Sequence, residues 1–346
     1  MELEATGPVF SRALFSAMGR VPIWSFVWAM EFLLALPLAL VWLGWFDGVL
    51  GSGYAPGEVT GYLDEVFRTD HRAGLSAMNT VSAHVGAVTA FLAILLGVFS
   101  AGGWLQVLLE RTRGQSLRRF FFGGARYFWR FFRVMLLTLA AMELFGWLLF
   151  EEPFQRSVLG SWFGVEESDW GRLESLDSEG TVFALRASQD ALYALAIALV
   201  FTWADYTRTR LALQGTHSAL WAGLQTIFTL LRHPVRTLRP LLLLILLEAL
   251  VIFGLGMVID WVELGFLPAE GSELAGRGRV WMLFALSQLV LMWRCVIRGA
   301  RYHATAIVSQ EIVRPLSRPD PWRESIGGPG GPRYPLEEGD EYGVAL

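Results

Sequence analysis

The chain has 346 residues, of which 54% are hydrophobic and 17% are charged, and its formal net charge is −4. A soluble domain of this length has about a quarter of its residues charged, so the composition excludes an ordinary soluble globular protein. All 28 basic residues are arginines, and the small net charge gives no indication of a nucleic-acid partner.

Six apolar runs reach the roughly 20 residues that a helix needs to cross about 30 Å of hydrocarbon. In chain order they occupy 22–46, 79–102, 133–151, 186–207, 240–261 and 279–300. A buried soluble core supplies one or two such runs, but hardly six. The sequence therefore predicts an all-α polytopic membrane protein with six transmembrane helices arranged as three hairpins.

A shorter segment of mixed apolar and basic residues precedes each outgoing run, at 7–20, 116–133 and 219–236. These segments are typical of amphipathic helices that lie in a membrane interface, here on the cytoplasmic side. Pro22, Pro234 and Pro240 indicate breaks where the chain turns into the membrane. In the middle segment we expect anionic lipid headgroups to contact five arginines: Arg118, Arg119, Arg126, Arg130 and Arg133.

Each outgoing run also contains a glutamate, nine to eleven residues after its last arginine: Glu31, Glu143 and Glu248. At about 1.5 Å per residue, all three carboxylates lie near the middle of the bilayer. The returning runs end on a tryptophan followed by arginines, at Trp104, Trp203 and Trp293. Together these features predict three pseudo-repeats, at about 7–112, 113–212 and 213–314, within one domain (1–314), followed by a disordered cytoplasmic tail over 315–346.

Three interpretations of the glutamates remain open. They hold the bundle together as neutral or hydrogen-bonded groups, they pair with Arg294 at a comparable depth, or they bind protons or a cationic substrate along a pathway. All three predict that the glutamates face the interior of the bundle. Arg294, Arg298 and Arg301 share one face of the last helix, and for Arg298 and Arg301 we expect contact with lipid headgroups.

The arginine distribution predicts the orientation. Most of the 28 basic residues fall in segments that are inside if the N-terminus is inside, whereas the intervening segment 151–185 is strongly acidic. The positive-inside rule then places both termini in the cytoplasm and predicts outside segments near 47–78, 151–185 and 262–278. We expect no cleavable signal peptide, and a multi-pass location in a bacterial inner membrane. Cys295 is the one cysteine, so no intramolecular disulfide forms.

Two blocks, FFFGGARYFWRFFRVMLLTLA at 120–140 and LLRHPVRTLRPLLLLILLEAL at 230–250, resemble bacterial six-helix proteins of the YciC and glycerophosphodiesterase membrane-domain type. The resemblance covers some forty residues. It implies a stand-alone integral membrane module without an established reaction, because the chain has no room for the phosphodiesterase catalytic domain.

The sequence contains no HExxH, no GxSxG and no Walker loop, and its five histidines are scattered. We therefore assign no catalytic, cofactor or metal site, and an enzyme is the least favoured class. We expect a non-catalytic membrane module that organises lipid or a partner protein, alone or as a subunit of a larger membrane complex. The alternative is a small-molecule or lipid transporter that uses the glutamates as coupling groups.

Overall fold

The computed structural model describes residues 9–50, 69–109, 115–154, 178–215, 218–265 and 273–312, and these ranges are almost entirely helical. In chain order the helices are α1 (Val9–Met18), α2 (Val21–Leu50), α5 (Arg72–Leu109), α6 (Ser116–Phe150), α7 (Glu152–Phe154), α9 (Glu179–Gln214), α10 (Ala219–Arg232), α11 (Pro234–Gly265) and α12 (Glu273–Ile312). Six of them are long and apolar enough to cross a membrane: α2, α5, α6, α9, α11 and α12. This confirms the prediction of six helices of membrane-spanning length.

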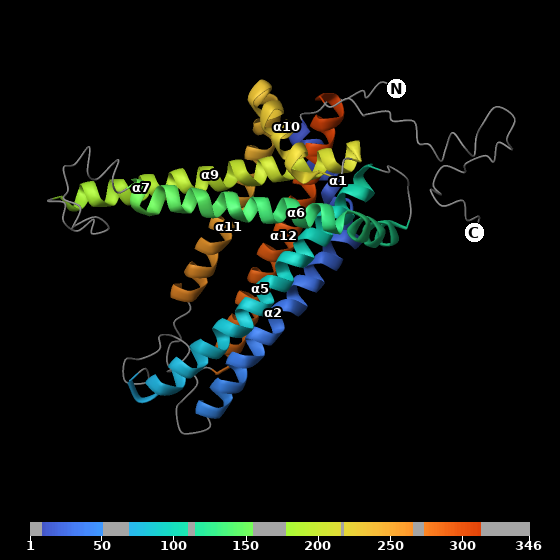
Figure 1. The fold of residues 1–346 in the computed structure, drawn as a ribbon. Helices are drawn as coiled ribbons and strands as arrows, with labels where there is room; N and C mark the ends of the chain where they lie inside the picture. The colour runs from blue at the N-terminus through green and yellow to red at the C-terminus, as the bar shows by residue number, and fades with distance from the viewer. Residues whose placement is uncertain are drawn as a thin grey trace, which may run out of the picture.

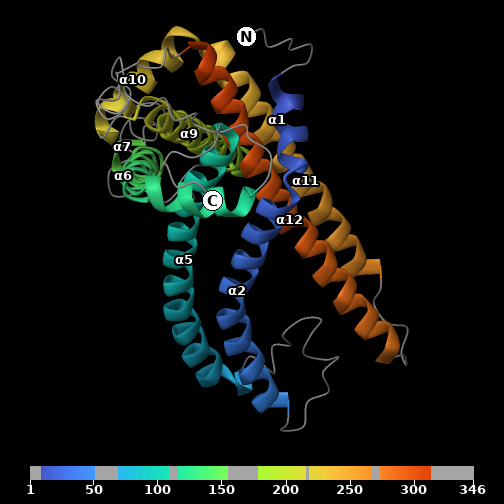
Figure 2. The same ribbon diagram turned by 90° about the vertical axis from the view of Figure 1, so that its right-hand side faces the viewer.

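The six long helices pack as three hairpins, α2–α5, α6–α9 and α11–α12. Figure 1 shows the α6–α9 hairpin running across the direction of the other two. Figure 2, which looks along much of α6 and α9, shows α2–α5 and α11–α12 diverging away from their common end. The hairpins therefore radiate from one region instead of forming a parallel bundle around a shared interior.

That region, which we call the hub, is formed by 100–108 of α5, 200–211 of α9 and 295–309 of α12, with α1, α10 and the first half of α6 packed around them. Residues 100–108 are buried on every face of α5, as in a helix surrounded by protein. Trp104, at the centre of this stretch, is fully buried. Beyond the hub the long helices are largely exposed and apolar, as lipid-facing helices are.

Two pairs of glycines allow α5 and α6 to cross with their backbones in contact. A Cβ on Gly102 would lie 2.6 Å from the carbonyl oxygen of Gly123, and one on Gly124 would lie 2.5 Å from the ring of Phe99. A Cβ on Gly103 would likewise collide with the ring of Phe120. Because backbone and ring atoms cannot move aside cheaply, only glycine fits this crossing, which fixes the start of α6 against the end of α5.

The segments expected to be interfacial form helices, with one difference in connection. α1 and α10 are separate helices that end just before α2 and α11, and Pro22 and Pro234 lie in the first turns of those long helices, where proline is tolerated. The segment 116–133, however, continues into its span as one helix, α6, and Pro240 lies inside α11 without ending it. The expected break at Pro240 is therefore wrong, and 116–133 is not a helix separate from the span that follows it.

The long helices also extend further than the apolar runs, so that residues 72–78 and 179–185, assigned to outside segments, are helical. Helices continue through the polar interface because their backbone hydrogen bonds are local. The remainder of those segments, most of the acidic segment 151–185 and the tail after 312 lie outside the described residues. The threefold repeat stays a prediction.

Candidate functional site: a line of ion pairs along α12

Three arginines on one face of α12 each meet a carboxylate from a different helix. Arg294 Nε lies 3.4 Å from Glu248 Oε1 on α11, and Arg298 Nη1 lies 2.6 Å from Glu31 Oε1 on α2. Arg301, which completes the i, i+4, i+7 pattern, places Nη2 2.6 Å from Oδ2 of a third carboxylate on α9. This face of α12 therefore connects all three hairpins through charge.

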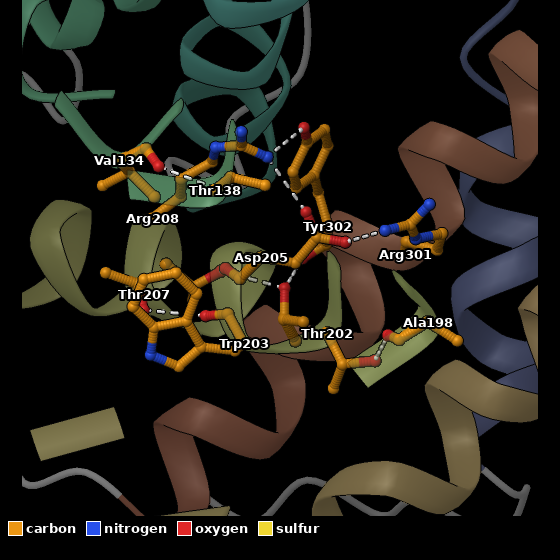
Figure 3. A network of polar contacts seen from close by, with 12 residues as sticks. Val134, Thr138, Ala198, Thr202, Trp203, Asp205, Thr207, Arg208, Arg301 and Tyr302 are labelled. Carbon is orange, nitrogen blue, oxygen red and sulfur yellow. Dashed lines mark hydrogen bonds and ion pairs between the residues drawn. The ribbon is translucent and has the colours of Figure 1, made fainter. Parts of the chain in front are cut away.

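That third carboxylate is Asp205, the most buried acidic group of the line, with a side chain only 3% exposed. It lies between Arg301 and Arg208, whose Nη1 is 3.2 Å from Asp205 Oδ1 and also donates to the Tyr302 hydroxyl at 3.4 Å (Figure 3). Two guanidinium groups thus share one carboxylate inside the hub, and charge-assisted hydrogen bonds of this kind are stronger than neutral ones.

Neutral hydrogen bonds extend the same α9–α12 contact. The hydroxyls of Thr209 and Thr305 are 2.9 Å apart, and both side chains are fully buried. On the other side of α9, the Trp203 indole donates to the carbonyl of Gly223 on α10 at 2.9 Å, and a Cβ on Gly223 would lie 2.8 Å from the indole. α9 is therefore held by specific polar contacts to both α10 and α12.

Burial along the line increases toward the hub. The side chain of Arg294 is 53% exposed, that of Arg298 is 29% exposed and that of Arg301 is 15% exposed. The Cys295 thiol donates to Glu31 Oε2 at 3.6 Å, so the glutamate on α2 receives two contacts from α12. The geometry can hold helices in a fixed register, because each pair is satisfied only at one axial and rotational setting.

Glu143 does not join this line. It is exposed on α6, and no hydrogen bond or ion pair to it occurs within the described part of the chain. The prediction that all three glutamates face the interior is therefore wrong for Glu143. The reason is helical phase: the buried stripe of α6 passes through Met135 and Thr138, and its 3.6-residue period continues through Met142 and Gly146, which turns Glu143 outward.

The arginines predicted to contact lipid headgroups divide into two groups. Arg298 and Arg301 form ion pairs with carboxylates of α2 and α9 inside the protein, so the structure corrects that assignment. The five arginines of α6 lie on or beside its exposed surface, with Arg118, Arg126 and Arg133 exposed and Arg119 and Arg130 half-buried.

Arg20, between α1 and α2, forms a hydrogen bond with the C-terminal end of α5 in the hub. Its Nη1 donates to the carbonyl of Val107 at 3.3 Å, in the last turn of α5. A cation is favourable there, because the unpaired carbonyls of a helix C-terminus carry partial negative charge. Burial lowers the pKa of Arg20, and the neighbouring guanidinium of Arg119 lowers it further.

Sequence reasoning missed Asp205, although a signal was present. The segment WADYTRTR at 203–210 has an acidic residue three and five residues before two arginines, at the end of an apolar run. The same tryptophan and arginines fit an interfacial anchor, a pattern that requires no tertiary partner for Asp205.

Within the described ranges, no three His, Cys, Asp or Glu side chains gather where they could hold a metal ion. An opening with room for about one water, 10 Å³, lies beside Tyr206, Arg210 and Thr229 at the α9–α10 contact. No family model, no curated protein and no solved structure matches this chain. The fold of the described ranges alone defines the class, an all-helical protein with six apolar helices of membrane-spanning length in that part of the chain.

Proposed function

We propose that this chain is a non-catalytic integral membrane module that gathers anionic lipid around its hub, on the cytoplasmic face of a bacterial inner membrane. The observation that carries the proposal is the orientation of α10 about its own axis. This helix packs its small and polar residues on the protein and turns its large apolar residues outward.

The buried residues of α10 are Ala219, Ala222, Gly223 and Thr226. Its exposed residues are Leu220, Trp221, Leu224, Ile227, Phe228 and Leu231, the last of them 73% exposed. α10 has 14 residues, about 21 Å, and so is too short to cross the membrane. A short helix with its apolar side away from the protein suits the headgroup and acyl boundary of a leaflet.

The exposed surface of the first half of α6 combines apolar and basic side chains in the same way. Trp129 is 69% exposed and Phe121 is 45% exposed, and Arg118, Arg126 and Arg133 are exposed with them. Each basic residue near an anionic membrane surface contributes about 1 kcal/mol of attraction. This chemistry favours anionic over neutral headgroups beside the hub.

The contacts of the glutamates favour the module over the transporter alternative. Glu31 and Glu248 are each held by an arginine of α12, so neither carboxylate has its charge available to a cationic substrate. The hairpins also diverge from the hub, so that α2, α6 and α11 do not run side by side around one axis (Figure 2).

The lipid preference is testable with the full-length chain in phosphatidylcholine vesicles that contain trace spin-labelled phosphatidylglycerol or spin-labelled phosphatidylcholine. We expect the motionally restricted fraction to be at least about twofold larger for phosphatidylglycerol, and to fall to the phosphatidylcholine level in Arg118→Gln/Arg126→Gln/Arg133→Gln. Arg186→Gln, which removes an exposed arginine near the far end of α9, is the matched control and should keep the preference. Equal restriction of the two lipids by the wild-type chain would refute the proposal.

The placement of α10 has its own test. A fluorophore on a cysteine at Phe228, in a Cys295→Ser background, should be quenched by nitroxides on the lipid tails. A fluorophore at Glu311, exposed near the end of α12, should be quenched by a water-soluble agent instead. If both positions respond only to the water-soluble agent, α10 does not enter the leaflet.

A further inference from the structure

A small opening lies between α9, α10 and α12, and its walls are both polar and apolar. It has room for about one water, 10 Å³, and is partly open to the outside. Arg210 of α9, Thr229 and Leu230 of α10, and Ser309 of α12 are among the residues that line it. A space of this size admits one oxygen atom of a ligand whose other atoms remain outside.

Arg210 brings a positive charge to the opening without a carboxylate partner in the described part of the chain. Its Nε donates to Gln214 Oε1 at 3.2 Å and its Nη1 donates to the Thr229 hydroxyl at 3.0 Å, and both acceptors are neutral. Each arginine of the α12 line, by contrast, faces a carboxylate. Glu311, exposed near the end of α12, forms no ion pair with Arg210. Three of the five guanidinium N–H groups therefore remain for an anion.

Ser309 adds a hydrogen-bond donor to the same opening. It is 3% exposed, and its hydroxyl forms no hydrogen bond within the described ranges. The other hydroxyls that line the opening, those of Tyr206, Thr226 and Thr229, already donate to backbone carbonyls. A buried hydroxyl is unfavourable until it finds an acceptor, so a cation and a free donor at one opening favour an anionic oxygen.

The apolar side of α10 begins at the same opening. Leu230 lines it, and Phe228 and Leu231, close by along α10, are 64% and 73% exposed. A ligand that fits both parts has an anionic oxygen and apolar chains, as a membrane phospholipid does. A phosphodiester has two non-bridging oxygens that share one negative charge, so one can accept from Ser309 while the other pairs with Arg210. Phosphatidylglycerol supplies that charge alone, whereas phosphatidylcholine brings its own cation beside the phosphate.

We propose that this opening is a binding site for the phosphodiester of one anionic lipid, with Arg210 pairing with the charge and Ser309 donating to an oxygen. The site rests on the proposed function, and it adds one defined lipid to the general attraction by the arginines of α6. The bound lipid contacts α9, α10 and α12 together, so it exchanges more slowly than lipids along α6. The expected stoichiometry is one such lipid per chain.

The experiment is native mass spectrometry of the full-length chain in detergent, titrated with phosphatidylglycerol or phosphatidylcholine. We expect one phosphatidylglycerol to bind at least about tenfold more tightly than the first phosphatidylcholine. Arg210→Gln should weaken that binding at least about tenfold, and Ser309→Ala about fivefold, the equivalent of one hydrogen bond. Arg186→Gln removes the same charge near the far end of α9 and, as the matched control, should bind like the wild type.

Two further variants separate this site from a folding defect and from the proposed function. Arg210→Lys keeps the positive charge and should bind phosphatidylglycerol more tightly than Arg210→Gln does. Arg118→Gln/Arg126→Gln/Arg133→Gln should lose the lipid preference along α6 but keep the one tightly bound phosphatidylglycerol, whereas Arg210→Gln should do the reverse. Absence of a tightly bound phosphatidylglycerol on the wild type, its loss in the α6 variant, unchanged binding by Arg210→Gln, or displacement by inorganic phosphate at a concentration equal to that of the lipid would each overturn the proposal.

Discussion

Replacing Asp205 by leucine should be among the most destabilising single substitutions in the hub. The carboxylate is 3% exposed and is shared by Arg301 at 2.6 Å and Arg208 at 3.2 Å. Its removal leaves two guanidinium groups, 15% and 12% exposed, facing each other without a counter-charge. Breaking a buried pair by removing one partner costs about 3–5 kcal/mol, which is about two to three and a half orders of magnitude in the folding equilibrium.

The pattern among variants distinguishes charge from packing. Arg208→Leu should cost about 1 kcal/mol or less, because Arg301 still neutralises Asp205 and the lost pair is an i, i+3 contact on one helix. Asp205→Leu/Arg301→Leu should recover at least about 1 kcal/mol relative to the sum of its single substitutions, because it removes both halves of the shortest pair.

The measurement is reversible unfolding of the full chain in mixed micelles as the fraction of sodium dodecyl sulfate rises. Asp190→Leu, an exposed acidic position on the same helix, is the control and should stay within about 0.5 kcal/mol of the wild type. If Asp205→Leu unfolds within about 1 kcal/mol of the wild type, or if the double variant equals the sum of the singles, the ion pairs do not hold the hub.

Three further predictions concern packing and topology. Gly102→Ala should destabilise the α5–α6 crossing by about 1–3 kcal/mol in the same assay, whereas Gly97→Ala, with nothing within 4 Å of its Cβ, should be neutral or stabilising. Trp203→Phe should cost about 1 kcal/mol, because the hydrogen bond from the indole to the carbonyl of Gly223 is lost. A single cysteine at Ser168 in a cysteine-free background should react with an impermeant thiol reagent in intact cells, and labelling only after lysis would reverse the orientation.

The class of fold was predictable from sequence because it depends on local properties. Whether a stretch is apolar and long enough to span a membrane can be counted residue by residue, and the six spans follow from that count. The alternation of outgoing and returning helices follows because each span returns the chain across the membrane. Neither inference requires knowledge of which helix faces which.

The site was only partly predictable, because it depends on rotation about each helix axis and on tertiary partners. Depth along a helix correctly suggested that a glutamate could meet Arg294, and the structure shows Glu248 there. The position of Glu143 along the helix axis could not show that its side chain is turned outward, because each step of one residue rotates the side-chain direction by about 100°. It also could not show that Arg298 and Arg301 point at carboxylates instead of headgroups, since Asp205 comes from a helix 96 residues away in the chain.

The ion pairs of α12 explain how hairpins that diverge can still form one molecule. Helices in lipid gain little from burying apolar surface against each other, because lipid tails are equally apolar. Divergent hairpins also share little contact beyond the hub, so their relative placement needs interactions that are specific at short range. The glycines at the α5–α6 crossing allow the two backbones to approach closely. The ion pairs fix the rotation and axial position of α12, because an arginine shifted by one residue would face hydrocarbon without its carboxylate. A helix with arginines at i, i+4 and i+7 can therefore set the register of α2, α9 and α11 together, and the loss of one pair should loosen one hairpin before the others.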